Sequence, residues 1–191
     1  MKNMAFPALS LIFLMAAAGC SFLSTQEYKE VAFYDLSAEK KLPRITSVPV
    51  EFRSFTDGTG NGVRFLIREE GRRVRLDSYN CFSAPPAQLI RRRLVELFPA
   101  AFSDDSVKIS AILNRFECDR QKGVALMAVD YQLSCNKQKK ALRHQIEVKI
   151  PVFDGPGIAA ALERSVILSA QRLAGEVTAF RKQCAAIKEK K

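Results

Sequence analysis

The chain has 191 residues, 48% of them apolar, and a formal net charge of +10 at neutral pH. Its apolar content excludes disorder for most of the chain, and its length suits one domain with its own core. Such a positive charge would favour nucleic acid as partner of a cytosolic protein, but an exported protein more readily meets anionic lipid head groups or an acidic protein surface.

The first nineteen residues have the layout of an export signal. Lys2 supplies positive charge, the run from Met4 to Ala18 is apolar, and small residues close it. The run is too short for a comfortable membrane span, which needs about 20 apolar residues. We therefore predict a cleaved signal peptide over residues 1–19.

The end of this signal resembles the bacterial lipobox in the segment Ala17-Ala18-Gly19-Cys20. The resemblance implies that Cys20 becomes the first residue of the mature chain and carries diacylglycerol and acyl chains such as palmitate. Several acyl chains give stable anchoring, because each buried CH₂ contributes about 0.8 kcal/mol. Ser21 favours the outer membrane over the inner one. The alternative is a plain secretory signal with an incidental cysteine.

The segment 20–30 is polar and aperiodic, so we predict a lipidated tether before a single domain over residues 31–187 and a basic tail at 188–191. Alternation of apolar residues predicts strands at 31–36 and 45–55, and Pro49 indicates an edge or a bulge in the second. A hairpin follows around the turn at Glu70-Gly71, with strands at 63–67 and 74–77.

A first helix should open at Ser83-Ala84-Pro85-Pro86, since proline is tolerated in the first turn. Its apolar face would hold Ile90, Leu94, Leu97 and Phe98.

Three further strands are expected at 107–117, 124–133 and 142–152. After Gly155-Pro156-Gly157 a long helix should run to about Ile187, with an apolar stripe that suits packing on a sheet, a coiled coil being the alternative. The order ββββ-α-βββ-α predicts a two-layer α+β domain, in which two helices pack on a largely antiparallel sheet of about seven strands.

Four cysteines follow Cys20, and an even number makes disulfides plausible in an oxidising compartment, with three pairings to choose from. A turn at Arg120–Gly123 would place Cys118 and Cys135 at opposite ends of a hairpin, so this pairing is the least favoured. Each of these two would pair with Cys81 or Cys184 instead, and reduced, buried cysteines are equally open.

Catalytic and metal motifs are not found in the sequence. The single histidine, His144, lies on the apolar side of its strand and is expected in the core, and no CxxC spacing suggests a zinc site. There is no GxSxG elbow and no P-loop. We therefore expect no enzyme, and no cofactor beyond the covalent lipid on Cys20.

Arginines gather in two places. Arg91, Arg92 and Arg93 span the polar side of the first helix, and Arg73 and Arg75 belong to the hairpin. They are either solvated faces or a basic contact surface for lipid phosphates or an acidic partner.

The segment 62–99 resembles the ABC-type transport auxiliary lipoproteins, the PqiC-like group that accompanies MCE-domain lipid transporters. The family's pattern is a strand, a turn, a strand ending in tyrosine, an aromatic residue, a proline pair and a helix. The matching positions here are Val63–Ile67, Tyr79, Phe82, Pro85-Pro86 and Leu89–Leu97, preceded by Phe33-Tyr34-Asp35-Leu36. Two departures are Phe82, where the family usually has tryptophan, and the cysteines.

The resemblance implies a non-enzymatic auxiliary or docking component of an intermembrane phospholipid transport system, anchored by lipid and facing the periplasm. Its partners would be an MCE-domain protein and the ABC permease and ATPase, with anionic phospholipid as a further contact, no nucleic acid, and a homo-oligomer permitted. A lipoprotein that assists assembly of an outer-membrane component, such as a lipopolysaccharide-export barrel, is the main alternative. An anchored periplasmic enzyme is a weaker one.

Overall fold

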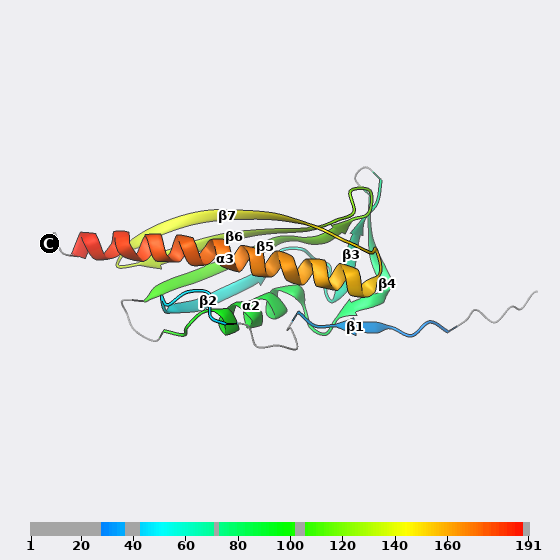
Figure 1. Ribbon diagram of the computed structural model, residues 1–191, viewed down its shortest axis with the longest axis horizontal. Coiled ribbons are helices and arrows are strands. Elements are labelled where there is room, and N and C mark those ends of the chain that lie inside the picture. The colour runs from blue at the N-terminus through cyan, green and yellow to red at the C-terminus, as the bar shows by residue number, and fades with distance from the viewer. Residues whose placement is uncertain (1–27, 37–42, 71–72, 102–105, 189–191) are drawn as a thin grey trace, which may run out of the picture. The chain divides into compact units, whose positions relative to one another are not determined.

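Of the chain, the computed structural model describes residues 28–36, 43–70, 73–101 and 106–188 (Figure 1). The predicted signal peptide, Cys20 and residues 21–27 lie outside these ranges. Residues Val31–Lys191 form one compact unit.

The elements follow the predicted order ββββ-α-βββ-α, which is confirmed. They are β1 (Ala32–Tyr34), β2 (Val50–Asp57), β3 (Arg64–Arg68), β4 (Val74–Phe82), α2 (Pro86–Leu97), β5 (Val107–Asp119), β6 (Val124–Cys135), β7 (Gln138–Lys149) and α3 (Gly155–Lys188).

The seven described strands form one mixed, mostly antiparallel sheet in the order β1-β4-β3-β5-β6-β7, with β2 paired to β5 outside this path. The pairs β3–β4, β5–β6 and β6–β7 are antiparallel, as successive strands joined by short turns should be. The pairs β1–β4, β2–β5 and β3–β5 are parallel. The first half of β5 therefore pairs with β2, and its end pairs with β3.

Several strand boundaries differ from the sequence prediction, and β4 continues to Phe82 beyond the predicted 74–77. β2 begins at Val50 and not at Ile45, directly after Pro49, and a bulge interrupts its pairing between Phe52 and Ser54. The expected irregularity near Pro49 is thus confirmed. β7 begins at Gln138, because two residues with positive φ, 49° and 67°, close a tight turn directly after β6. The strand ends at Lys149.

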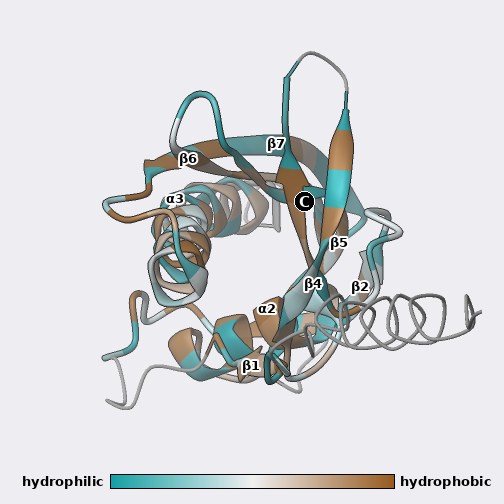
Figure 2. Ribbon diagram, turned by 90° about the vertical axis from the view of Figure 1, so that its right-hand side faces the viewer, coloured by the Kyte–Doolittle hydropathy of each residue, from teal (hydrophilic) through white to brown (hydrophobic). Residues whose placement is uncertain are grey.

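Both helices lie on the same face of the sheet. Figure 2, viewed along the molecule, shows the sheet curving around that face, with α3 beside β6 and β7 and α2 near β2. The coiled-coil alternative for α3 is wrong, since its apolar stripe is buried against the sheet. The buried positions of this stripe are Leu162, Val166, Ser169, Leu173, Val177, Phe180 and Cys184.

A row of aromatic rings fills the core at the β1 end of the sheet. Ring centroids are 5.2 Å apart for Tyr34 and Phe65, 4.5 Å for Phe65 and Phe82, and 5.4 Å for Phe82 and Phe116. Contacts at these spacings add about 0.5–1.5 kcal/mol each beyond area burial. Phe82, from the proline-flanked segment of the resemblance, is therefore a core residue.

Candidate functional site

The arginine run on α2 does not form one exposed surface. Arg91 and Arg92 are exposed, but Arg93 is 2% exposed and faces α3. Its guanidinium pairs with Glu96 at 2.8 Å and with Glu163 of α3 at 3.2 Å. The expectation that Arg93 lies on the polar side is wrong, because position 93 is three residues after Ile90 and so falls on the buried face.

Arg92 is also engaged, since both oxygens of Asp35 accept hydrogen bonds from its guanidinium. This pair connects α2 to the segment that follows β1. Burial raises the pKa of Glu163, although the neighbouring Arg93 acts to lower it. Of the three arginines, Arg91 is the one whose guanidinium is described with no carboxylate partner among the residues that the structure covers.

The hairpin arginines lie elsewhere. Arg73 and Arg75 both pair with Glu69, at 3.5 and 3.0 Å, and hydrogen bonding from Arg75 helps to hold the pKa of this carboxyl below its usual value. In Figures 1 and 2 the described ends of β3 and β4 that flank their turn point away from α2. The two predicted patches are therefore separate.

A third basic position, at the end of β3 next to the hairpin turn, is structural. The buried carboxylate of Glu117 accepts hydrogen bonds from Arg68 at 2.9 and 3.1 Å and from Arg115 at 3.0 Å. Burial alone would raise the pKa of Glu117, but these hydrogen bonds and charges outweigh it, so the pKa is lowered. The cluster ties β3 to β5.

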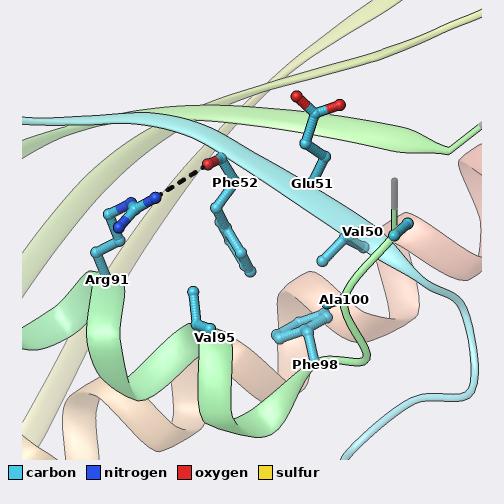
Figure 3. Close-up of a pocket in the computed structure, with 8 residues that line it drawn as sticks. Val50, Glu51, Phe52, Arg91, Val95, Phe98 and Ala100 are labelled. Atoms are coloured by element: carbon cyan, nitrogen blue, oxygen red, sulfur yellow. Dashed lines mark hydrogen bonds between the residues drawn. The ribbon is translucent and has the colours of Figure 1, made fainter. Parts of the chain in front are cut away.

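A groove opens between β2 and α2 (Figure 3). It exists because the chain after α2 returns to β2: Val50 donates to the Pro99 carbonyl at 2.9 Å, and Ala101 donates to the Val50 carbonyl at 3.0 Å. This α2–β2 groove has a volume of about 170 Å³. Its apolar lining is Val50, Phe52, Val95, Phe98, Ala100 and Ala101, with Glu51 and Arg91 at the rim.

The polar rim of the groove is asymmetric. Arg91 reaches across from α2 and donates to the Phe52 carbonyl at 3.4 Å, whereas the Glu51 carboxylate points away from α2 (Figure 3). Val95 is 45% exposed, so its isopropyl group is available at the groove surface. A group that binds in the groove would therefore contact apolar side chains next to one cation, Arg91.

The groove is too small for a whole lipid. Sites for small molecules usually measure about 300–1,000 Å³, while a cavity of about 150 Å³ holds a single benzene ring. One apolar side chain would fit in it. Two more open hollows, of about 440 and 400 Å³, lie over the sheet strands at Ser54, Ile112 and Gln132 and beside the hairpin at Arg73 and Arg120.

The histidine lies in the core, as predicted. His144 is 7% exposed, its Nδ1 is 3.1 Å from the Ser169 hydroxyl, and the same hydroxyl is 3.1 Å from the Tyr131 hydroxyl. Burial and the nearby Arg172 lower the pKa of His144, against the opposing effect of Glu176. These hydrogen bonds connect α3 to β6 and β7. Because Ser169 is fully buried, a substrate could not reach the network.

All four described cysteines are thiols, and all are buried. Burial raises the pKa of Cys118 to about 12 and that of Cys184 to about 11. Within the described residues there is no group of three or more His, Cys, Asp or Glu side chains suited to a metal ion. In the same ranges, none of the helices combines the length and apolarity that crossing a membrane requires.

The protein is thus an α+β domain with two helices on one face of a curved mixed sheet, and it has a small apolar groove beside α2. Two of the solved structures that share this fold match it over almost their whole length. One is protein XCC0632 from Xanthomonas campestris, of the family DUF330, with a TM-score of 0.64, 14% identity, and coverage of 81% of this chain and 99% of that one. The other is an uncharacterized protein with a TM-score of 0.63 and 13% identity, covering 78% of this chain and 99% of that one.

At such low identities the likeness establishes a common fold. No family model and no curated protein matches the sequence.

Proposed function

We propose that this protein is a lipid-anchored periplasmic component of an ABC-type MCE phospholipid transport system, in which it docks the transport assembly and catalyses no reaction. The observation that carries the proposal is the fold likeness over 99% of the length of XCC0632, a DUF330 protein. DUF330 is the PqiC-like family, the same group that the segment 62–99 resembles. A distant fold likeness and an independent sequence resemblance thus support one function.

The anchor follows from the lipobox at residues 17–20. Lipid on Cys20 holds the domain at the membrane, with the outer membrane favoured by Ser21. The ABC permease and ATPase supply the work of transport, and this domain supplies position. The anchoring proposal predicts that Cys20→Ala abolishes metabolic labelling with palmitate, while the neighbouring Ser21→Ala keeps it. Labelling that survives Cys20→Ala would refute the anchor.

The α2–β2 groove is the docking site for the MCE protein in this proposal. Its volume suits one apolar side chain, and side chains seated in such pockets supply much of the binding energy of protein interfaces. Arg91 at the rim favours a partner that carries an acidic group next to its apolar anchor. Arg92 and Arg93 contribute by fixing α2 in place, since their charges are already paired.

The proposal is tested by affinity capture of the tagged, full-length protein from solubilised membranes. Wild type should capture the MCE protein. Val95→Lys should capture at least tenfold less of it, because a lysine places a charge where the partner buries apolar surface. Val152→Lys is the matched control, since Val152 is 61% exposed and does not line the groove. Capture of no MCE protein by wild type would sink the function.

The charge at the rim is tested in the same assay. Arg91→Glu should weaken capture, and Arg164→Glu, at an exposed position of α3, should leave it unchanged. Equal loss in both variants would point to net charge and not to the groove. Recovery of an outer-membrane barrel protein in place of the MCE protein would support the lipopolysaccharide-export alternative.

A further inference from the structure

The end of α3 meets the turn between β6 and β7 through two cysteines. Cys135 is the last residue of β6, and Cys184 lies in the last turns of α3. The Cys184 thiol donates toward the Cys135 carbonyl oxygen at 3.6 Å, and the Cys135 side chain helps to raise the pKa of Cys184. The two side chains are 3% and 1% exposed. They are therefore in direct contact and sheltered from water.

The other two cysteines are out of reach of this pair. Cys118 lies opposite Ala125, and the stretch of β6 from there to Cys135 spans roughly 34 Å at about 3.4 Å per residue. Cys118 cannot reach Cys81 either, because β3 lies between β4 and β5. Two strand spacings separate their backbones by roughly 9–10 Å, whereas a disulfide needs Cα atoms within about 7 Å.

We propose that Cys135 and Cys184 form a disulfide bond in the exported protein, and that Cys81 and Cys118 stay reduced. This inference rests on the export part of the proposed function, since disulfides persist in oxidising compartments. The approach of the Cys184 sulfur to the Cys135 carbonyl oxygen, at 3.6 Å and across a sequence separation of 49 residues, carries it.

The chemistry is thiol–disulfide exchange with an oxidised dithiol oxidoreductase. One cysteine thiolate attacks the disulfide of the oxidant, which releases one oxidant sulfur as a thiolate and leaves a mixed disulfide. The second cysteine thiolate then displaces the remaining oxidant sulfur and closes the Cys135–Cys184 bond. Two protein thiols lose two protons and two electrons, and the oxidant becomes a dithiol.

The exchange takes place while the chain folds. After α3 has docked, both sulfurs are buried, and burial raises the pKa of Cys184, so few thiolates remain to react. Arg181 lies beside the pair, with its Nη1 3.8 Å from the Cys135 sulfur, and its charge acts to lower the pKa of Cys184 against the effect of burial. Once formed, the bond ties the end of α3 to the β6–β7 turn and closes a loop that contains β7 and almost all of α3.

The experiment uses the full-length protein, exported in its host and purified from membranes in detergent. It is denatured in N-ethylmaleimide without reductant and digested, and the peptides are identified by mass spectrometry. We expect a Cys135–Cys184 cross-linked peptide, with Cys81 and Cys118 alkylated as controls within the chain. Alkylation of both Cys135 and Cys184 before reduction would overturn the proposal, as would a cross-link to either control cysteine.

A second measurement covers the stability of the bonded protein. Dithiothreitol should lower the Tm of the wild type by about 10 °C, since a disulfide that closes a loop of this length restrains the unfolded chain. The Tm of the Cys135→Ser/Cys184→Ser variant should not respond to dithiothreitol, and that of Cys81→Ser should respond like wild type. An equal response in the double variant would contradict the assignment.

Failure here is distinguishable from failure of the proposed function. The same protein can be reduced, unfolded and refolded in a glutathione redox buffer. The bond should form there whether or not the cell exports the protein. A cross-link in this buffer supports the geometry, and its absence refutes it. Capture of the MCE protein is measured separately and does not depend on either result.

Discussion

The buried ion pair between Arg93 of α2 and Glu163 of α3 should show an unequal cost when either partner is removed. Arg93 is 2% exposed, and a guanidinium is a permanent cation in proteins, whereas the Glu163 side chain is 25% exposed and its pKa is raised by burial. A stranded arginine therefore stays charged without water. A stranded glutamate keeps some water and accepts a proton more readily.

The magnitudes follow from this asymmetry. Glu163→Leu should lower the unfolding free energy by about 3 kcal/mol. This is the lower end of the range for leaving one member of a buried ion pair without its partner, because Glu96 still contacts Arg93 at 2.8 Å. Arg93→Met should cost about 2 kcal/mol, near the value of one lost hydrogen bond to a charged group. The double variant should also cost about 2 kcal/mol and not the sum, since packed apolar residues replace a pair well.

The assay is urea unfolding of the lipid-free chain from Ser21 onward, followed by far-ultraviolet circular dichroism because the chain has no tryptophan. A coupling energy of about 3 kcal/mol is expected, at the upper end of the range for contacting residues. A larger cost for Arg93→Met than for Glu163→Leu would refute the reasoning, and so would additive costs in the double variant.

Three other predictions concern the core, the acid limit and the start of α3. Leu94→Ala should lower the unfolding free energy by about 3 kcal/mol, because the fully buried side chain leaves a cavity; a loss below about 1 kcal/mol in urea unfolding would contradict the packing. The pKa of Glu117 is lowered in the folded state, so its charged form stabilises the fold above pH 4.5, and this contribution is lost as the pH falls through the folded-state pKa. Glu117→Gln should therefore have a smaller unfolding free energy than wild type at neutral pH, and its unfolding free energy should fall less on acidification. Gly157→Ala should destabilise the domain, since a Cβ there would collide with the backbone carbonyl oxygen of Val152, and an unchanged Tm would show that this contact is not tight.

Local pairing is predictable from the sequence, and distant pairing is not. The turn at Arg120–Gly123 predicts that Cys118 lies opposite about Val124, and the structure places it opposite Ala125. Such hairpins depend on turn residues and alternation, which the sequence displays. The parallel pairing of β2 with β5 has no local signal, because alternation tells which face of a strand is buried and not which strand lies beside it.

The candidate site is less predictable than the fold. A run of three arginines looks like a solvated surface, but helical spacing from Ile90 to Arg93 and Leu97 places Arg93 on the buried face, and that signal is present in the sequence. The α2–β2 groove has no such signal. It depends on the return of the chain to Val50 after α2, a tertiary contact that residue patterns do not encode.

Strand β1 is the point at which tension on the upstream chain enters the domain. It has three residues, runs parallel to β4, and is followed by Asp35, which Arg92 holds. A pull along the chain acts along this strand and loads its hydrogen bonds together, in shear, instead of opening them one by one. Through Arg92 part of that load reaches α2, the helix that also lines the groove. Strain from the proposed lipid anchor and occupancy of the groove would therefore act on the same helix.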